Sequence, residues 1–523
     1  MADMTTMTIG YACDPETVHA KQYVTHLTAL GATVRVHDVD ALPQMNLDGL
    51  DVLIVDADPR GRDGVMRGSW RQPPVGLTLD TFTVPTIVVG TFGSFLSESL
   101  GTKLGAAGGC WCLDEHAYVY DRSHPVWAGI DLDNLIEVFP TPEHHLSHDE
   151  LDVPATLDRI EIVAVPQDVA GQVSFGGGFL DSPDTDLIAG GTNTKTHEHF
   201  SIARHGRFLQ WGFAGTPEDW TAAGKTLFAN CLAYIAEFAD ADIQAFRATG
   251  PRSLLQNKLG YEVPWDNLPA SMLEQFKASH FGGMFGDDVP AQAKLDRTER
   301  MAWLHDNLEY VSYAGVEGIG HWFIDQDVQI WGVSNREMAV LDRCLAEADD
   351  VAGRVWQRYT GRSFDDVEVE AAWLAQHRDH LWFTDWGGYR WVSSLEANNP
   401  LPPRSEPVRS DLFQASMAAR RNDGGAVVAI DLLISPTHFA YPPGSDEGLP
   451  ITVTVADGSP FSMAGDLRVH ADQDGHLRDS SNIRFDVQGD GGLVEVDLRV
   501  QLCDDNACLP PTVLRLTAPV ISA

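Results

Sequence analysis

An alternating segment near the end of the chain leads directly into a pair of cysteines. Apolar residues occupy every second position of Val494-Glu-Val-Asp-Leu-Arg-Val-Gln-Leu502, a pattern that predicts a half-buried strand. The next residues are Cys503-Asp-Asp-Asn-Ala-Cys508, in which the Asp-Asn pair predicts a turn, and Pro510 and Pro511 fix how the chain leaves it. The sequence therefore predicts a β-hairpin whose tip carries a dithiol.

The cysteine pair admits two interpretations. Cysteines separated by four residues can close a small ring, and a disulfide at an exposed turn is open to attack by a thiolate. The spacing alone fits a structural staple across the hairpin equally well, because a cysteine pair specifies no chemistry by itself. Asp504 and Asp505 should raise the pKa of a neighbouring thiol by like-charge repulsion. We therefore expect a slow or sensing dithiol rather than a fast oxidant.

Short strand-like runs separated by turns continue from about Ser410 to the end of the chain. They include Ala426–Ile434, Leu449–Val455 and Asn482–Val487. Such a series predicts an all-β sandwich.

Two motifs in this region carry a family resemblance. They are His438-Phe-Ala-Tyr-Pro-Pro-Gly444, followed by Glu447-Gly-Leu-Pro450, and Cys503-x4-Cys508-Leu-Pro-Pro511. On these motifs, Pro407 to Val520 resembles the amino-terminal, immunoglobulin-like domain of the thiol:disulfide interchange protein DsbD. The resemblance implies that Cys503 and Cys508 are a catalytic redox pair, exchanging disulfides with a thioredoxin-like or other redox protein through a mixed disulfide.

The chain departs from that family in its other parts. The membrane-embedded and thioredoxin-like domains of the full transporter are absent, and no Cys-x-x-Cys occurs in the 523 residues. Any electron relay would therefore need other chains. The redox module favours a periplasmic or secreted location, with the leader left off, and the alternative is a cytoplasmic protein, because Met1–Gly10 has no signal-peptide character.

The charge of the chain limits its partners. It has 75 Asp and Glu against 36 Lys and Arg, a formal net charge of −39. This field should repel nucleic acid and anionic lipid, and no apolar run reaches the ~18 residues of a membrane span, so we expect neither nucleic-acid binding nor membrane insertion. The surplus of carboxylates is typical of a protein adapted to high salt, although codon bias would also explain the scarcity of Lys.

The first 240 residues have a different rhythm, in which strands alternate with helices. Met7–Ala12, Thr33–His37, Asp51–Asp56 and Val84–Gly90 read as strands, and Pro15–Leu30 reads as an amphipathic helix. This alternation predicts an α/β domain with a flavodoxin-like parallel sheet and helices on its faces.

The same region resembles the class I glutamine amidotransferase-like and ThuA-like domains. The resemblance rests on His124-Pro-Val-Trp-Ala-Gly129 and on Gly206-Arg-Phe-Leu-Gln-Trp-Gly-Phe213, which is followed by a helix over Ala222–Phe238. An active member would need a Cys on a strained turn between a strand and a helix. This chain has Gly90-Thr-Phe92-Gly-Ser94 there, so we expect a non-catalytic scaffold rather than an active amidotransferase.

Other chemistry-bearing residues have mostly structural explanations. Ser94 lacks a recognisable Ser-His-Asp constellation, and Cys110-Trp-Cys112 has a spacing that usually reflects packing. Histidines that could ligate a metal cluster at two places, but neither place matches a complete ligand motif. We therefore expect no metal and no cofactor. The histidines are His144, His145 and His148, and then His197, His199 and His205.

Residues 241–399 read as a mainly α-helical domain rich in tryptophan. Helices are expected over Arg297–Asn307, Asn335–Ala348, Asp350–Tyr359 and Val367–His377, with Ser334 or Asn335 capping the second. The tryptophans could form an aromatic platform for a sugar, but at helical spacing they more often belong to a core. They are Trp303, Trp322, Trp331, Trp356, Trp373, Trp382, Trp386 and Trp391.

The sequence thus predicts three domains, at residues 1–240, 241–399 and 408–523, with a proline-rich linker at 400–407. The first hypothesis for function is thiol-disulfide exchange or redox-controlled partner binding through Cys503 and Cys508. The alternative is a non-enzymatic binding or assembly protein for a carbohydrate or a protein, in which the same pair is a structural disulfide.

Overall fold

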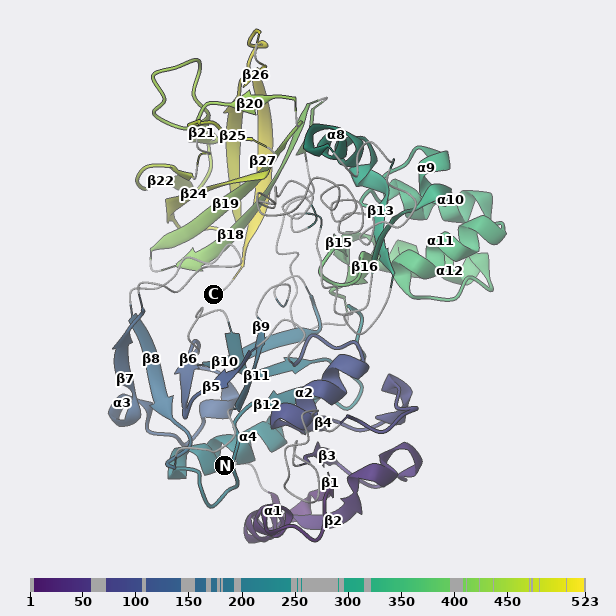
Figure 1. Ribbon diagram of the computed structural model, residues 1–523, viewed down its shortest axis with the longest axis vertical. Helices are drawn as coiled ribbons and strands as arrows, with labels where there is room; N and C mark the ends of the chain where they lie inside the picture. Colours follow the sequence, from purple (N-terminus) through teal and green to yellow (C-terminus); the bar gives the residue numbers. More distant parts are fainter. Residues whose placement is uncertain are drawn as a thin grey trace, which may run out of the picture. The chain divides into compact units, whose positions relative to one another are not determined.

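The computed structural model divides into two compact units, one within Met1–Thr249 and the other within Gly250–Ala314 and His321–Ala523 (Figure 1). No helix in the described part of the chain is long and apolar enough to cross a membrane. The domain boundaries expected from the sequence stay predictions, and the expected linker lies outside the described residues. The structure describes residues 4–57, 72–105, 110–142, 156–165, 171–175, 179, 182–191, 199–245, 252, 255, 290, 296–314, 321–395, 408–410, 412–422, 424–435, 437–469, 471, 474–478, 480–504 and 506–521.

Five strands of the first unit form a parallel sheet in the order β2-β1-β3-β4-β12. The apolar runs of β1, β3, β4 and β12 are buried on both faces, as is typical of parallel strands covered by helices, whereas the edge strand β2 has no buried residue. The strands are β1 (Thr8–Cys13), β2 (Thr33–Asp38), β3 (Val52–Val55), β4 (Thr86–Val89) and β12 (Phe208–Trp211).

Helices cover the two faces of this sheet. Alternate strand residues point to opposite faces, so Ile9 and Val52 pack in one core cluster, with α1 (Val18–Ala29) and α4 (Ala222–Ala236). Leu53 and its neighbours on the other face pack with α2 (Gly90–Ser99). Thr17 and Thr221 cap α1 and α4 by accepting backbone N–H groups, which explains where these helices begin.

The sheet continues beyond β12 as antiparallel strands, in the order β12-β11-β10-β6-β8-β7. The expectation of a parallel sheet was therefore wrong for this half, and the mixed sheet does not confirm the flavodoxin-like arrangement. The remaining elements of the unit are β5 (Cys110–Leu113), β6 (His116–Val119), α3 (Leu132–Leu135), β7 (Glu137–Pro140), β8 (Thr156–Glu161), β9 (Gly171–Phe175), β10 (Thr185–Gly191) and β11 (His199–His205), of which β9 pairs with β5 and β11.

Helices and two small hairpins begin the second unit. Helices α8 and α12 have the bounds expected from the sequence. The side chains of Asp296 and Asp366 cap their amino termini, which explains where these helices begin. The expected cap of α10 was wrong, since this helix begins after Met338. The elements are α8 (Arg297–Asn307), β13 (Val311–Ala314), β14 (His321–Ile324), α9 (Gln326–Trp331), α10 (Ala339–Glu347), α11 (Asp350–Thr360), α12 (Val367–His377), β15 (Leu381–Thr384) and β16 (Arg390–Ser393).

Most of the tryptophans of this region belong to its core. Trp322, Trp356, Trp382 and Trp391 are buried, and the other four are half-buried. Two apolar clusters hold most of them against the hairpins and helices. The interpretation as core is confirmed for the tryptophans in those clusters.

A sheet-rich sandwich ends the chain. Its main strand order is β21-β25-β27-β18-β19-β24-β22, with β17 and β23 added beside β18 and β24. Strand β25 buries Val494, Val496, Leu498 and Val500, so the half-buried strand expected from alternation is confirmed. The strands are β17 (Val408–Arg409), β18 (Phe413–Asn422), β19 (Gly425–Ile434), β20 (Phe439–Ala440), β21 (Thr452–Val455), β22 (Phe461–Met463), β23 (Arg468–Val469), β24 (Ser480–Gly489), β25 (Leu493–Val500), β26 (Leu502–Cys503) and β27 (Thr512–Ile521).

Candidate redox site at the hairpin tip

Strands β25 and β27 form an antiparallel hairpin whose tip holds the two cysteines. The last pair of the ladder is Val500 with Thr512, and the tip lies between them. Cys503 and Cys508 face each other as a bridge pair and are joined by a disulfide bond. Below them, the backbone N–H of Leu509 donates to the Leu502 carbonyl at 2.8 Å. The expected hairpin and the proximity of its two thiols are thus present.

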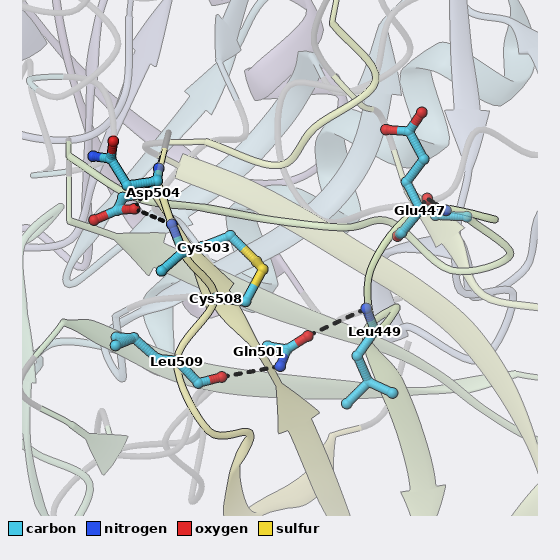
Figure 2. The surroundings of a disulfide bond; sticks show 10 residues. Glu447, Leu449, Gln501, Cys503, Asp504, Cys508 and Leu509 are labelled. Atoms are coloured by element: carbon cyan, nitrogen blue, oxygen red, sulfur yellow. Dashed lines mark hydrogen bonds between the residues drawn. A yellow bond between two sulfur atoms is a disulfide. The ribbon is translucent and has the colours of Figure 1, made fainter.

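The two cysteines differ in exposure. Cys503 is 1% exposed, because it belongs to β26 and pairs with Phe439 of β20. Cys508 lies on the outgoing arm of the tip and is exposed. Figure 2 shows the pair between the turn at Asp504 and the loop that carries Leu449. A thiolate from solvent can therefore approach the sulfur of Cys508 more readily than that of Cys503.

The side chain of Asp504 organises the turn between the cysteines. Its Oδ1 accepts the backbone N–H groups of Asn506 and Ala507, both at 2.7 Å. These hydrogen bonds lower the pKa of the Asp504 carboxyl, and nearby His438 lowers it further. Asp504 is therefore ionised at neutral pH beside the disulfide, whereas Asp505 lies outside the described residues.

A closed loop from Tyr441 to Ile451 lies next to the tip. The N–H of Ile451 donates to the Tyr441 carbonyl at 2.9 Å, which ties the two ends of the loop together. Gly448 has a φ of 64°, and a Cβ placed there would lie 2.0 Å from a ring carbon of Tyr441. Glycine is thus required at this position by both backbone conformation and contact.

Gln501 connects this loop to the tip (Figure 2). Its Nε2 donates to the carbonyl of Leu509 at 2.9 Å, and its Oε1 accepts the N–H of Leu449 at 3.2 Å. The role of Gln501 cannot be seen in the sequence, because only the folded loop shows that its amide faces a donor and an acceptor from two different segments.

Aromatic and cationic groups support the strand that covers Cys503. The ring of Phe439 stacks on His476 with centroids 4.1 Å apart, and the guanidinium of Arg478 lies 4.6 Å from the Phe439 centroid. Tyr441 meets the same His476 edge to face at 5.4 Å. These contacts hold β20 over the buried cysteine.

The other cysteines whose side chains are described are not reactive. Cys13, Cys231 and Cys344 are free and buried. Burial raises the pKa of each of these thiols, so each stays protonated at neutral pH. Cys110 and Cys112 both lie in β5, and their side chains are not among those that the structure describes.

The turn between β4 and α2 in the first unit contains a glycine in the left-handed region of the backbone. That residue is Gly90, with a φ of 55°. Phe92 is fully buried in the core, and Ser94 is 1% exposed within α2. Ser94 is therefore shielded from any substrate that would approach from solvent.

Two of the six histidines that the sequence offers as metal ligands, His199 and His205, lie in the described part of the chain. His205 is buried, and its Nε2 lies 3.3 Å from an Asp184 carboxylate oxygen, while its Nδ1 accepts the N–H of Lys103. This pairing indicates a structural role. His199 is buried in β11. The other four histidines lie outside the described residues: His144, His145, His148 and His197.

One further group of potential ligands was missed from the sequence. Atoms of Asp114, Glu115 and His116 lie within 4.8 Å of one another. The sequence does carry a signal for this group, because its three residues are consecutive and all are types that can ligate a metal. All three residues are only half-buried, and such groups are common on an acidic surface without an ion.

Comparisons with known proteins leave the family open. No family model matches the chain, and no curated protein matches it. Among solved structures, it is similar to the DsbD n-terminal domain of Neisseria meningitidis in the reduced form, at 15% identity over 20% of this chain and 86% of that chain, with a TM-score of 0.15.

Two other solved structures match with similar coverage. The GAE domain of GGA2p from Saccharomyces cerevisiae is 11% identical over 22% of this chain and 96% of its own, with a TM-score of 0.16. The collagen-binding subdomain ACE19 of the Enterococcus faecalis surface protein ACE is 11% identical over 22% of this chain and 99% of its own, with a TM-score of 0.12. Such similarities carry no argument about what this chain does, and none of these three structures is named as an amidotransferase.

Proposed function

We propose that the chain carries out thiol-disulfide exchange, or redox-controlled partner binding, through Cys503 and Cys508. The observation that supports this most is the asymmetry of the disulfide, in which one cysteine is exposed and the other is 1% exposed. An exposed cysteine gives an incoming thiolate access, and the sulfur of the buried cysteine is then the one that leaves.

The exchange follows from that asymmetry. A partner thiolate attacks the sulfur of Cys508, the Cys503–Cys508 bond breaks, and its electron pair leaves on the Cys503 sulfur, which takes a proton from water. The product is a mixed disulfide between Cys508 and the partner. A second partner thiolate then attacks the partner's sulfur, releases Cys508 as a thiolate and forms the partner's own disulfide. Two electrons have then passed from the partner to this chain, and the reverse sequence oxidises a partner.

The rest of the chain would present this site. In the first unit, Gly90-Thr-Phe92-Gly-Ser94 stands where the amidotransferase-like domains need a nucleophile, and Phe92 cannot act as one, so we propose this unit as a non-catalytic scaffold. The partner in this proposal is a thioredoxin-like or other redox protein, in a periplasmic or secreted setting.

The alternative remains a binding or assembly protein with a structural disulfide. One observation favours it, namely that Cys503 is buried under β20 and pairs with it in a ladder. The sulfur of Cys503, enclosed in this way, is hard for an attacking thiolate to reach once the disulfide has formed.

The reduction potential of the pair decides between the two. The full chain is equilibrated in graded glutathione buffers, and peptides that contain Cys503 and Cys508 are counted for alkylation by mass. We expect a potential of roughly −120 to −270 mV, the range of exchange proteins, whereas a value below about −300 mV would mark a structural staple and refute the proposal.

Single substitutions test the order of attack. In Cys503→Ala, the remaining Cys508 should form a mixed disulfide with a small disulfide probe readily. In Cys508→Ala, Cys503 should react at least tenfold more slowly, because it is buried. Equal rates in the two variants would contradict the proposed attack at Cys508.

A further inference from the structure

The side chain of Gln501 is the feature from which a further role can be argued. It stands between β25 and β26, half-buried, directly before the tip. Its two hydrogen-bonding groups serve different segments, since Nε2 reaches the carbonyl of Leu509 and Oε1 receives the N–H of Leu449. The two partners are eight and 52 residues away in the sequence.

The chemistry of these partners fixes the orientation of the amide. A carbonyl can only accept and a backbone N–H can only donate, so the NH₂ group must face Leu509 and the oxygen must face Leu449. No other side chain of this length offers a donor and an acceptor at its end. Glutamate would keep the contact with Leu449 but place a negative oxygen against the Leu509 carbonyl.

We propose that Gln501 is a positioning residue. Its two hydrogen bonds form a clamp that holds the outgoing arm of the tip, Cys508 and Leu509, against Cys503. This inference rests on the proposed exchange function and names the residue that sets its equilibrium. Gln501 does not touch the sulfur atoms in any described contact, and it acts through the residue that directly follows Cys508.

The clamp matters most when the disulfide is open. In the oxidised chain the covalent bond itself closes the tip. After reduction, the tip keeps the local turn at Asp504, the hydrogen bond from Leu509 to Leu502, and the clamp by Gln501. Of these, only the clamp anchors the arm to the closed loop from Tyr441 to Ile451. It therefore lets the reduced arm spend more of its time with Cys508 near Cys503.

Loss of these hydrogen bonds should change the equilibrium of disulfide closure in one direction only. Closing the disulfide requires the arm to be in place, so a preformed arm raises the effective concentration of one thiol at the other. Loss of the clamp loosens the reduced state without weakening the covalent bond. The equilibrium constant for closure should fall, and the potential should become less negative.

The test compares the full-length chain with Gln501→Leu and Gln501→Glu. Each protein is equilibrated with glutathione. In this reaction the protein dithiol and one oxidised glutathione give the protein disulfide and two reduced glutathione molecules. We expect Gln501→Leu to lower the closure constant about tenfold, which corresponds to about 30 mV. Gln501→Glu should shift the potential in the same direction, while the amide of Leu449 stays protected from hydrogen exchange. In Gln501→Leu that protection should be lost.

A matched control is the exposed Gln488 on β24 of the same sandwich, since Gln488→Leu makes the same chemical change away from the tip. It should leave the potential unchanged. A wild-type potential in the exchange range that neither Gln501 variant moves would overturn this inference and leave the proposed function intact. A wild-type potential below about −300 mV would instead overturn the function itself. If Gln501→Leu fails to fold, the shift in Gln501→Glu alone decides.

Discussion

At the scale of single residues, Asp504 makes the turn of the tip sensitive to acid. Its pKa lies below the ordinary aspartate value because two backbone N–H groups donate to it. A depressed pKa in the folded state means that its contribution is fully present above the ordinary pKa and is lost as the pH falls through the depressed one. We expect the amide signals of Asn506 and Ala507 in NMR spectra to titrate with a midpoint below the ordinary aspartate value.

Two substitutions separate charge from hydrogen bonding in this prediction. Asp504→Asn keeps an acceptor oxygen, so the turn should persist and the titration should disappear. Asp504→Ala removes the acceptor, so the amides of Asn506 and Ala507 should exchange faster at every pH. A titration that survives in Asp504→Asn would show that another group causes it.

Residues whose roles are local could be predicted from the sequence, and those with distant partners could not. The turn between Cys503 and Cys508 was predicted from the residue types within it, and the structure contains this turn. Gln501 could not be predicted, because its loop partner is 52 residues away. Asn335 shows the same limit: expected as a helix cap, it is instead buried and donates to Val311 and Tyr359. A capping residue type bonds to whatever acceptor the tertiary fold brings to it.

At the scale of elements, the loop from Tyr441 to Ile451 depends on one glycine. Gly448→Ala adds a methyl group that meets the Tyr441 ring and also carries the cost of a positive φ. Overpacking of this kind costs about 1–3 kcal/mol. We expect the amide of Ile451, which donates to Tyr441, to exchange at least tenfold faster in this variant.

Gly444 supplies the control for that loop. It also has a positive φ, 78°, but a Cβ there meets nothing within 4 Å. Gly444→Ala therefore carries the backbone cost, about 1–2 kcal/mol, without the clash. If both variants accelerate exchange at Ile451 equally, the contact with Tyr441 contributes nothing to closing the loop.

Helices were easier to predict than strand pairing, because the ends of a helix depend on neighbouring residues and the pairing of strands depends on distant ones. The bounds of α8 and α12 follow from caps next to them in the sequence. The antiparallel half of the first sheet depends on which distant strands meet, as with β6 and β10. Periodicity gives the buried face of a strand but not its neighbour, so the mixed sheet could not be derived from the alternation of strands and helices.

At the scale of the whole molecule, the net charge of −39 should make stability depend on salt. At about 10 mM ionic strength the screening length is about 30 Å, so surplus carboxylates repel one another across the surface, whereas at 1 M it is about 3 Å. Screening also weakens exposed ion pairs such as Arg122–Asp133, but 75 acidic residues outnumber 36 basic ones, so repulsion dominates. We expect each calorimetric melting temperature to rise by several degrees between these conditions, since about 1 kcal/mol shifts the melting temperature of a 150–250-residue domain by about 2–4 °C.

The choice of salt separates screening from other effects of salt on folding. Sodium and potassium chloride should give the same rise, which levels off once the screening length is a few ångströms. Sodium sulfate is excluded from protein surfaces and should stabilise further without levelling off. A rise seen only in sulfate would mean that general exclusion, rather than charge repulsion, governs the stability of the chain. A fall in chloride would mean that its ion pairs outweigh its surplus of carboxylates, and high-salt adaptation would then be the wrong explanation of the composition.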